Sequence, residues 1–128
     1  MRHPLDVVLG PADVLAVETA VAGAVVRATA VGELDLSSAN ALEDALRSVL
    51  ERHRPSQLVL DLRGLTFLDS SGLHLLSALA GEARAGDWRL TVVRGPDHVQ
   101  RTIESVGLDA HLEIVDDPRR VGDGPGVV

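Results

Sequence analysis

The sequence contains no cysteine and no lysine. Without cysteine, the chain cannot form a disulfide, a thiolate nucleophile or a cysteine-ligated zinc site. All twelve basic residues are arginine, so a phosphate-binding loop of the Gly-x-x-x-x-Gly-Lys type is excluded as well. Any ATP used in the chemistry of this protein must therefore be held by a partner.

Aromatic residues are almost as scarce, since Phe67 and Trp88 are the only two. The core must then be built from Val, Leu, Ile and Ala, which suits a small sheet covered by helices. No aromatic platform is left for stacking nucleic-acid bases. The formal net charge of −7 also opposes binding to a phosphate backbone. We therefore expect no direct contact with nucleic acid.

Long apolar runs are missing too. No stretch of about 18 apolar residues occurs, and the start, Met1 to Pro4, lacks the apolar core of a secretory signal. We expect no membrane insertion and, given the missing cysteines, a cytoplasmic location. The 128 residues, 45% of them hydrophobic, suffice for one domain with a modest core.

The five histidines do not form a metal-binding pattern. No two of them flank a glutamate in the way that marks a helical zinc site. They are scattered along the chain as His3, His53, His74, His98 and His111. We therefore expect no metal site and no bound cofactor.

Strand and helix patterns alternate along the chain after an initial hairpin. Two β-prone runs are separated by residues 19–23, where Gly23 supplies the turn. Periodic apolar residues then predict helices, and short apolar runs predict further strands. The predicted strands are Val14 to Glu18, Ala24 to Val31, Leu58 to Leu62, Leu90 to Val93 and Leu112 to Val115. The predicted fold is α/β, with a four- or five-stranded mixed sheet packed against helices.

Local signals predict where three helices begin and end. The first is capped by Ser37 or Ser38 and stopped by Pro55. The second stops near Gly86, where a glycine can take the left-handed C-cap conformation. The third is closed by Gly107. It is expected to turn three apolar side chains inward, those of Val99, Ile103 and Val106.

Composition divides the chain into three parts. We expect an N-terminal extension over residues 1–13 and one domain over residues 14–117. From Pro118 the sequence has no periodicity and is rich in glycine and charge. Residues 118–128 are therefore predicted to be a disordered tail.

The segment from Leu65 to Leu73 is the most informative, because an apolar extended run passes through Asp69, Ser70 and Ser71 into a helical pattern. Apolar residues then recur at helical spacing, at Leu73, Leu76, Leu79, Ala80 and Ala83. A helix N-terminus favours anionic groups, so either serine could carry a phosphate there. The simpler alternative is that these residues only cap the helix.

Other motifs occur in a recognisable order around this segment. Residues 32–35 read Gly-Glu-Leu-Asp, and Ser37-Ser38 follow at the head of a helical pattern. Together with residues 67–73 and Val106-Gly107-Leu108, they resemble the STAS domain family, specifically the bacterial anti-sigma factor antagonists. The resemblance runs from about Val14 to Asp116 and implies a STAS-like fold.

The resemblance also implies a site. The phosphorylated serine of the family falls on Ser70, with Ser71 as its unmodified neighbour. The family's acidic loop residue falls on Asp35, and the aspartate before the phosphoacceptor falls on Asp69. His74 stands where such proteins often have a glycine. The residues expected to meet a partner are Asp35, Asp69, Ser71, Gly72 and His74.

The function implied by the resemblance is a partner switch without enzymatic activity of the chain itself. The unphosphorylated protein would bind an anti-sigma factor that is also a GHKL-type serine kinase. Phosphorylation of Ser70 would end the interaction, and a PP2C-type phosphatase would restore it.

Two alternatives to this switch stay open. His74 lies four residues after Ser70, so a serine nucleophile is conceivable, but the Gly-x-Ser-x-Gly elbow is absent and nothing supplies an orienting partner for the base. The second is a STAS scaffold or accessory subunit of a signalling assembly or membrane lipid transporter, which would share the fold without the switch.

Overall fold

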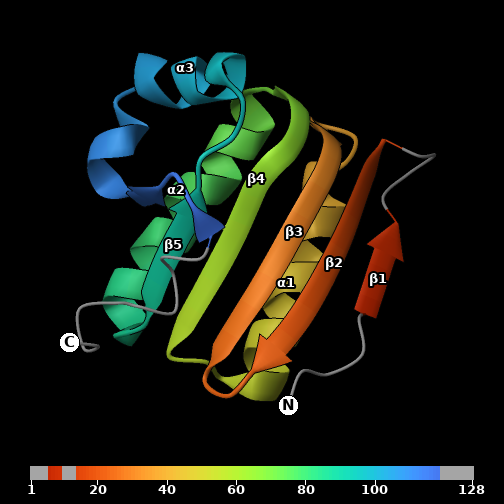
Figure 1. Ribbon diagram of the computed structural model, residues 1–128, viewed down its shortest axis with the longest axis vertical. Coiled ribbons are helices and arrows are strands. Elements are labelled where there is room, and N and C mark those ends of the chain that lie inside the picture. The colour runs from red at the N-terminus through yellow and green to blue at the C-terminus, as the bar shows by residue number, and fades with distance from the viewer. Residues whose placement is uncertain (1–5, 10–13, 119–128) are drawn as a thin grey trace.

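The computed structural model describes residues 6–9 and 14–118. Helices α1 and α2 lie behind one face of a twisted mixed sheet in the view of Figure 1, and α3 lies at one end of it. The elements in chain order are β1 Asp6–Leu9, β2 Leu15–Ala22, β3 Val25–Leu34, α1 Ala39–His53, β4 Gln57–Leu68, α2 Ser70–Gly86, β5 Arg89–Val93, α3 Asp97–Ser105, the short 3₁₀ helix η2 Leu108–His111 and β6 Glu113–Val115. The predicted tail lies outside the described residues except for Pro118.

The sheet has six strands among the described residues, in the order β1-β2-β3-β4-β5-β6. The pairs β1–β2 and β2–β3 are antiparallel, and the strands from β3 to β6 run parallel to one another. The predicted α/β fold with an initial hairpin and a mixed sheet is confirmed. The described part of the sheet has six strands, whereas four or five were expected. The additional strand is β1, which is only four residues long and lies in the segment expected to be an N-terminal extension.

A two-residue turn joins β2 to β3. Ala22 and Val25 are register partners, so only Gly23 and Ala24 lie between the strands. Gly23 has a φ of 59°, in the left-handed region that glycine adopts without strain. The predicted role of Gly23 is confirmed, although β2 extends four residues into the segment expected to be loop.

The main core lies between the sheet and the two long helices. Alternate residues of β4, Leu58, Leu60 and Leu62, point toward it and are fully buried. The helices contribute apolar stripes, which are Leu42, Ala45, Leu46 and Val49 from α1 and Leu75, Leu76, Leu79, Ala80 and Ala83 from α2. The last four of these were predicted for α2, and Leu75 was not. Leu73, predicted to face inward, is half-buried.

Two predictions about helix ends are wrong. Val106 was expected to turn inward, but α3 ends at Ser105, and the Val106 side chain is 62% exposed. Gly86 was expected to take the left-handed cap of α2, but Asp87 takes it with a φ of 56°. Gly86 is instead the last residue of the helix, where an added Cβ would lie 2.9 Å from the Trp88 ring.

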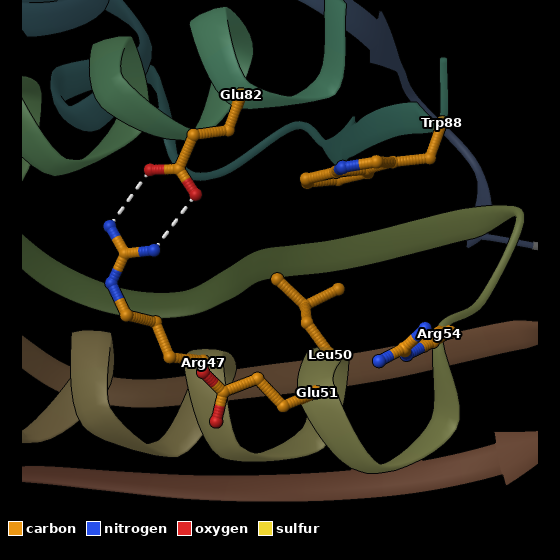
Figure 2. A pocket seen from close by; sticks show the side chains of 6 residues that line it. All are labelled: Arg47, Leu50, Glu51, Arg54, Glu82 and Trp88. Atoms are coloured by element: carbon orange, nitrogen blue, oxygen red, sulfur yellow. Dashed lines mark hydrogen bonds and ion pairs between the residues drawn. The ribbon is translucent and has the colours of Figure 1, made fainter. Parts of the chain in front are cut away.

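An ion pair joins α1 to α2 near their C-terminal halves (Figure 2). The Arg47 guanidinium donates two hydrogen bonds of 2.8 Å to the Glu82 carboxylate and also contacts Glu43. These side chains are each more than a third exposed, so the pair contributes at most about 1 kcal/mol. Beside it lies a hollow of about 290 Å³, across which the Trp88 ring faces Leu50.

A buried carboxylate lies on the sheet face opposite the long helices. Asp61 is 3% exposed and alternates with the residues of the main core. Burial acts to raise the pKa of Asp61. Hydrogen bonds from Arg63, including one of 2.8 Å from Nη2, outweigh this and hold the pKa below its ordinary value of 3.8. The charged carboxylate therefore stabilises the folded state.

We expect Asp61→Asn to lower the free energy of unfolding at pH 7 by about 1–3 kcal/mol, because a charged hydrogen-bonded pair is lost. Because the pKa of Asp61 is lower in the folded state than in the unfolded state, the Asp61 carboxylate stabilises the fold above pH 3.8. This stabilisation is lost as the pH falls through the pKa of Asp61 in the folded state. Urea unfolding at pH 7 measures the loss of stability, and the same experiment at pH 3 measures how much of it depends on pH. The exposed Asp44→Asn is the control, and a variant at 61 that keeps the full acid sensitivity of the wild type would contradict this account.

Candidate functional site

The carboxyl ends of β3 and β4 meet at one edge of the sheet. Leu34 and Leu68 are register partners, and the Asp69 amide donates a 3.2 Å hydrogen bond to the Leu34 carbonyl. Asp35 and Asp69 therefore leave the sheet from adjacent strands. This pairing brings together two acidic residues that are 34 positions apart in the sequence.

The Asp35 carboxylate organises the turn before α1. Its Oδ1 accepts hydrogen bonds from the Ser37 amide at 2.9 Å, the Ser37 hydroxyl at 2.7 Å and the Ser38 amide at 3.2 Å. The Ser37 hydroxyl bond is the largest of the influences that hold the pKa of Asp35 below its ordinary value. Asp35 thus holds the turn that precedes α1 and stays ionised at neutral pH.

Ser38 is the N-cap residue of α1, as predicted, but its side chain does not perform the capping. The Ser38 hydroxyl points back toward β3, where it donates to the Glu33 carbonyl at 2.7 Å and accepts from the Asp35 amide at 3.0 Å. Ser38 is fully buried and makes no side-chain capping bond to the helix. Its hydroxyl instead fixes the loop in which Asp35 stands.

Asp69 caps α2, as its residue type predicts. Its backbone is extended, and its carboxylate accepts hydrogen bonds from the Ser71 amide at 2.9 Å and the Gly72 amide at 3.4 Å. Ser70 is the first helical residue and is exposed. Within the part of the chain that the structure describes, its hydroxyl makes no hydrogen bond. Asp69 performs the capping, so Ser70 is left free.

Gly72 is a packing position in this structure. It is buried, and a Cβ added there would lie 2.3 Å from Leu68 Cδ1 and 2.8 Å from Leu34 Cγ. The first turn of α2 rests directly on the ends of β3 and β4 at this point. Gly72 therefore positions the start of α2, and its contact with a partner stays a prediction. Ser71 is half-buried beside it.

His74 is exposed and separates two shallow hollows. The first, of about 330 Å³, lies between α2 and residues 106–111. It is lined by Ser70, Leu73, His74, Ser77, Val106, Leu108 and His111. The second, of about 350 Å³, lies between α1 and α2 and is bordered by His74, Ser71, Leu36 and Glu43, among others.

Three large apolar side chains are exposed on the elements next to Ser70. Leu36 is 79% exposed and borders the second hollow, and Val106 is 62% exposed and borders the first. Phe67, three residues before Ser70, is 46% exposed. Large apolar side chains gathered around one site are typical of a protein-binding surface. Sequence reasoning missed Leu36 and Val106, although an apolar residue inside the Asp35–Ser38 turn was a signal for the first.

The described residues hold neither a catalytic triad nor a metal centre. His74 makes no hydrogen bond to Ser70 within residues 14–118, and the Asp69 carboxylate is bonded to helix amides rather than to a histidine. No group of three or more His, Asp or Glu in the described ranges is placed to hold a metal ion. No helix in these ranges is long and apolar enough to span a membrane.

Comparison with known proteins identifies the family. The family model described as "Mlab, STAS domain" matches residues 16–116, from the second residue of β2 to just beyond β6. The chain belongs to the STAS domain family.

Similar proteins carry a more specific description. The anti-sigma-F factor antagonist RsfB of Mycobacterium tuberculosis (strain ATCC 25618 / H37Rv) is 38% identical over 78 residues, which are 61% of this chain and 62% of that protein. The match thus spans less than two thirds of the relative. The crystal structure of an anti-sigma factor antagonist from Mycobacterium paratuberculosis superposes with a TM-score of 0.76 at 28% identity, covering 87% of this chain and 93% of the other.

The fold is also that of the anti-sigma factor antagonist SpoIIAA. Its unphosphorylated form matches with a TM-score of 0.72 at 19% identity, covering 89% of this chain and 98% of the other. The phosphorylated form of the Bacillus protein matches with a TM-score of 0.64 at 18% identity, covering 84% and 96%. At such identities the likeness shows the fold alone.

We expect Gly72→Ala to lower the free energy of unfolding by about 1–3 kcal/mol, because the new methyl group overpacks the contact with Leu34 and Leu68. Gly81→Ala is the matched control in the same helix. No atom lies within 4 Å of an added Cβ at 81, so this variant should gain about 0.5–1 kcal/mol from helix propensity. Denaturant unfolding of both variants measures the difference, and equal stabilities would contradict the close packing at Gly72.

Proposed function

We propose that this chain is an anti-sigma factor antagonist switched by phosphorylation of Ser70. In the unphosphorylated state it binds an anti-sigma factor that is also a GHKL-type serine kinase, and phosphorylation ends the binding. The observation that carries this proposal is the exposed Ser70 hydroxyl, which has no hydrogen bond within the described residues because Asp69 already caps α2. The name of the 38% identical relative supports the same function.

The energetics favour a switch that acts on binding rather than on folding. A phosphoserine carries a charge of about −1.5 to −2 at neutral pH. In the free protein the N-terminus of α2 stabilises this charge by about 0.3–2 kcal/mol. At a docked surface a buried charge without a partner costs about 2–5 kcal/mol. The second effect is larger, so the phosphorylated protein dissociates while its fold stays intact.

The surface around Ser70 suits a protein partner. The kinase would cover three exposed apolar side chains, those of Leu36, Phe67 and Val106. The charged Asp35 would lie at the edge of the covered surface. The kinase supplies ATP and magnesium, and a PP2C-type phosphatase removes the phosphate. The cycle of phosphorylation and dephosphorylation takes place in the cytoplasm, and the kinase docks on the domain of residues 14–117. The chain neither contacts nucleic acid directly nor inserts into a membrane.

A scaffold or accessory subunit of a signalling assembly or membrane lipid transporter is the alternative role for a STAS domain. Such a role needs no modifiable hydroxyl at position 70. A pull-down from the native cytoplasm with Ser70→Ala as bait separates the two. Recovery of a GHKL-type kinase supports the antagonist, and recovery of a transporter complex supports the alternative.

We expect phosphosite mapping after incubation with the cognate kinase and Mg-ATP to place the phosphate on Ser70. Ser70→Asp should abolish kinase binding in a titration while leaving the circular dichroism spectrum unchanged, because a carboxylate is tolerated at a helix N-terminus. Ser48→Ala, at an exposed position of α1 outside the predicted site, is the control and should be bound and phosphorylated normally. Phosphate found on Ser71, or an aspartate variant that binds as tightly as the wild type, would refute the switch.

The role of Asp35 in binding can be separated from its role in the turn with two variants. Asp35→Asn keeps a side-chain oxygen that can accept the Ser37 and Ser38 amide bonds, but it removes the charge. If the Asp35 charge contacts the kinase, this variant should lose more than tenfold in kinase affinity or Ser70 phosphorylation. Its melting temperature should fall only slightly, because the hydrogen bonds to the turn are kept. Asp35→Ala should lose thermal stability in addition. Normal binding by the asparagine variant would leave Asp35 with its role in the turn alone.

A further inference from the structure

The hollow beside Ser70 contains an ionisable side chain that the proposed switch does not use. Ser70 and His74 are four residues apart on α2 and line the same 330 Å³ hollow. Side chains at this spacing lie about 5–6 Å apart at their Cβ atoms. Both are exposed, and within residues 14–118 neither side chain has a hydrogen-bond partner. A group attached to Ser70 would therefore extend toward a free imidazole.

The charged groups that face His74 from the neighbouring elements are already engaged. From α1, Glu43 borders the second hollow, but its carboxylate is paired with Arg47 at 3.0 Å. At the start of α2, the Asp69 carboxylate accepts two helix amides. From η2, the facing titratable group is His111, which is a second imidazole and not an anion. A phosphate on Ser70 would be the nearest anion without a partner.

We propose that His74 binds the phosphate of phospho-Ser70 through a charge-assisted hydrogen bond across one turn of α2. The proposal rests on the proposed function, because it takes Ser70 as the modified residue. An unperturbed imidazole has a pKa of about 6.5, and the second ionisation of phosphoserine has a pKa of about 6. Both groups thus carry charge near neutral pH, and each favours the charged form of the other.

This contact would give the released state a binding site for its own phosphate. His74 is then a positioning residue, which holds the modified group on the surface of the chain rather than taking part in its transfer. The pair is strongest where the imidazole is protonated and the phosphate is a dianion.

The test uses the full chain with phosphoserine installed at position 70 by genetic encoding. The imidazole signals and the ³¹P signal are followed by NMR as the pH is varied. We expect the pKa of His74 to rise by about 1 on phosphorylation, at the low end of the ~1–3 seen beside an opposite charge, since the site is open to solvent. The second pKa of the phosphate should fall correspondingly. His53, at the far end of α1, serves as the reference.

Two variants distinguish a specific contact from a general electrostatic effect. His74→Gln should return the phosphate to the titration of an unpartnered phosphoserine. His74→Arg should keep the phosphate pKa low, because its guanidinium stays charged throughout. Circular dichroism of the unphosphorylated variants checks that the exposed position tolerates both changes.

Three results would overturn the proposal. They are an unchanged pKa of His74 on phosphorylation, equal rises at His74 and His53, and an unchanged phosphate titration in His74→Gln. The phosphate is installed without a kinase, so the outcome does not depend on the partner. Failure of the kinase to modify Ser70 would contradict the proposed function, whereas a failed titration contradicts only the role of His74.

Discussion

The contact of Gly72 with Leu34 and Leu68 is the constraint on which the site depends. It allows the first turn of α2 to rest on the ends of two parallel strands, with no side chain between the helix and the sheet. The helix can therefore begin two residues after the strand ends, and Asp69 can bond both to the Leu34 carbonyl and to the amides of α2. A larger residue at position 72 would lift the helix and displace the Ser70 hydroxyl.

Around this contact, structural and functional tasks are divided between neighbouring residues. Asp35 holds the turn before α1, Asp69 caps α2, and Ser38 anchors the loop between β3 and α1. Ser70 and His74 take part in none of these bonds and face solvent. A negative charge can therefore be added at Ser70 without loss of a bond that holds the described fold together. Such a division suits a protein whose surface changes while its core does not.

The sequence predicted the features that arise from local chemistry. The cap at Asp69, the turn at Gly23 and four of the five predicted apolar positions of α2 follow from residue type and spacing, and the structure confirms them. Features that depend on distant contacts were not predictable in this way. The close packing of Gly72 needs Leu34 from another strand, and the burial of Ser38 needs the Glu33 carbonyl. The family resemblance supplied Ser70, and Leu36 had a local signal because it is an apolar residue inside a turn, but the exposure of Val106 had none.

The hollow at the C-terminal halves of α1 and α2 has a consequence for spectroscopy. Trp88, the only tryptophan of the chain, lies there opposite Leu50, at the other end of α2 from Ser70. Its indole is in contact with the helix layer but far from the surface assigned to the kinase. Intrinsic fluorescence should thus follow the separation of the two helices during unfolding and stay nearly silent when a partner docks. One native fluorophore can therefore report the integrity of the fold independently of the state of the switch.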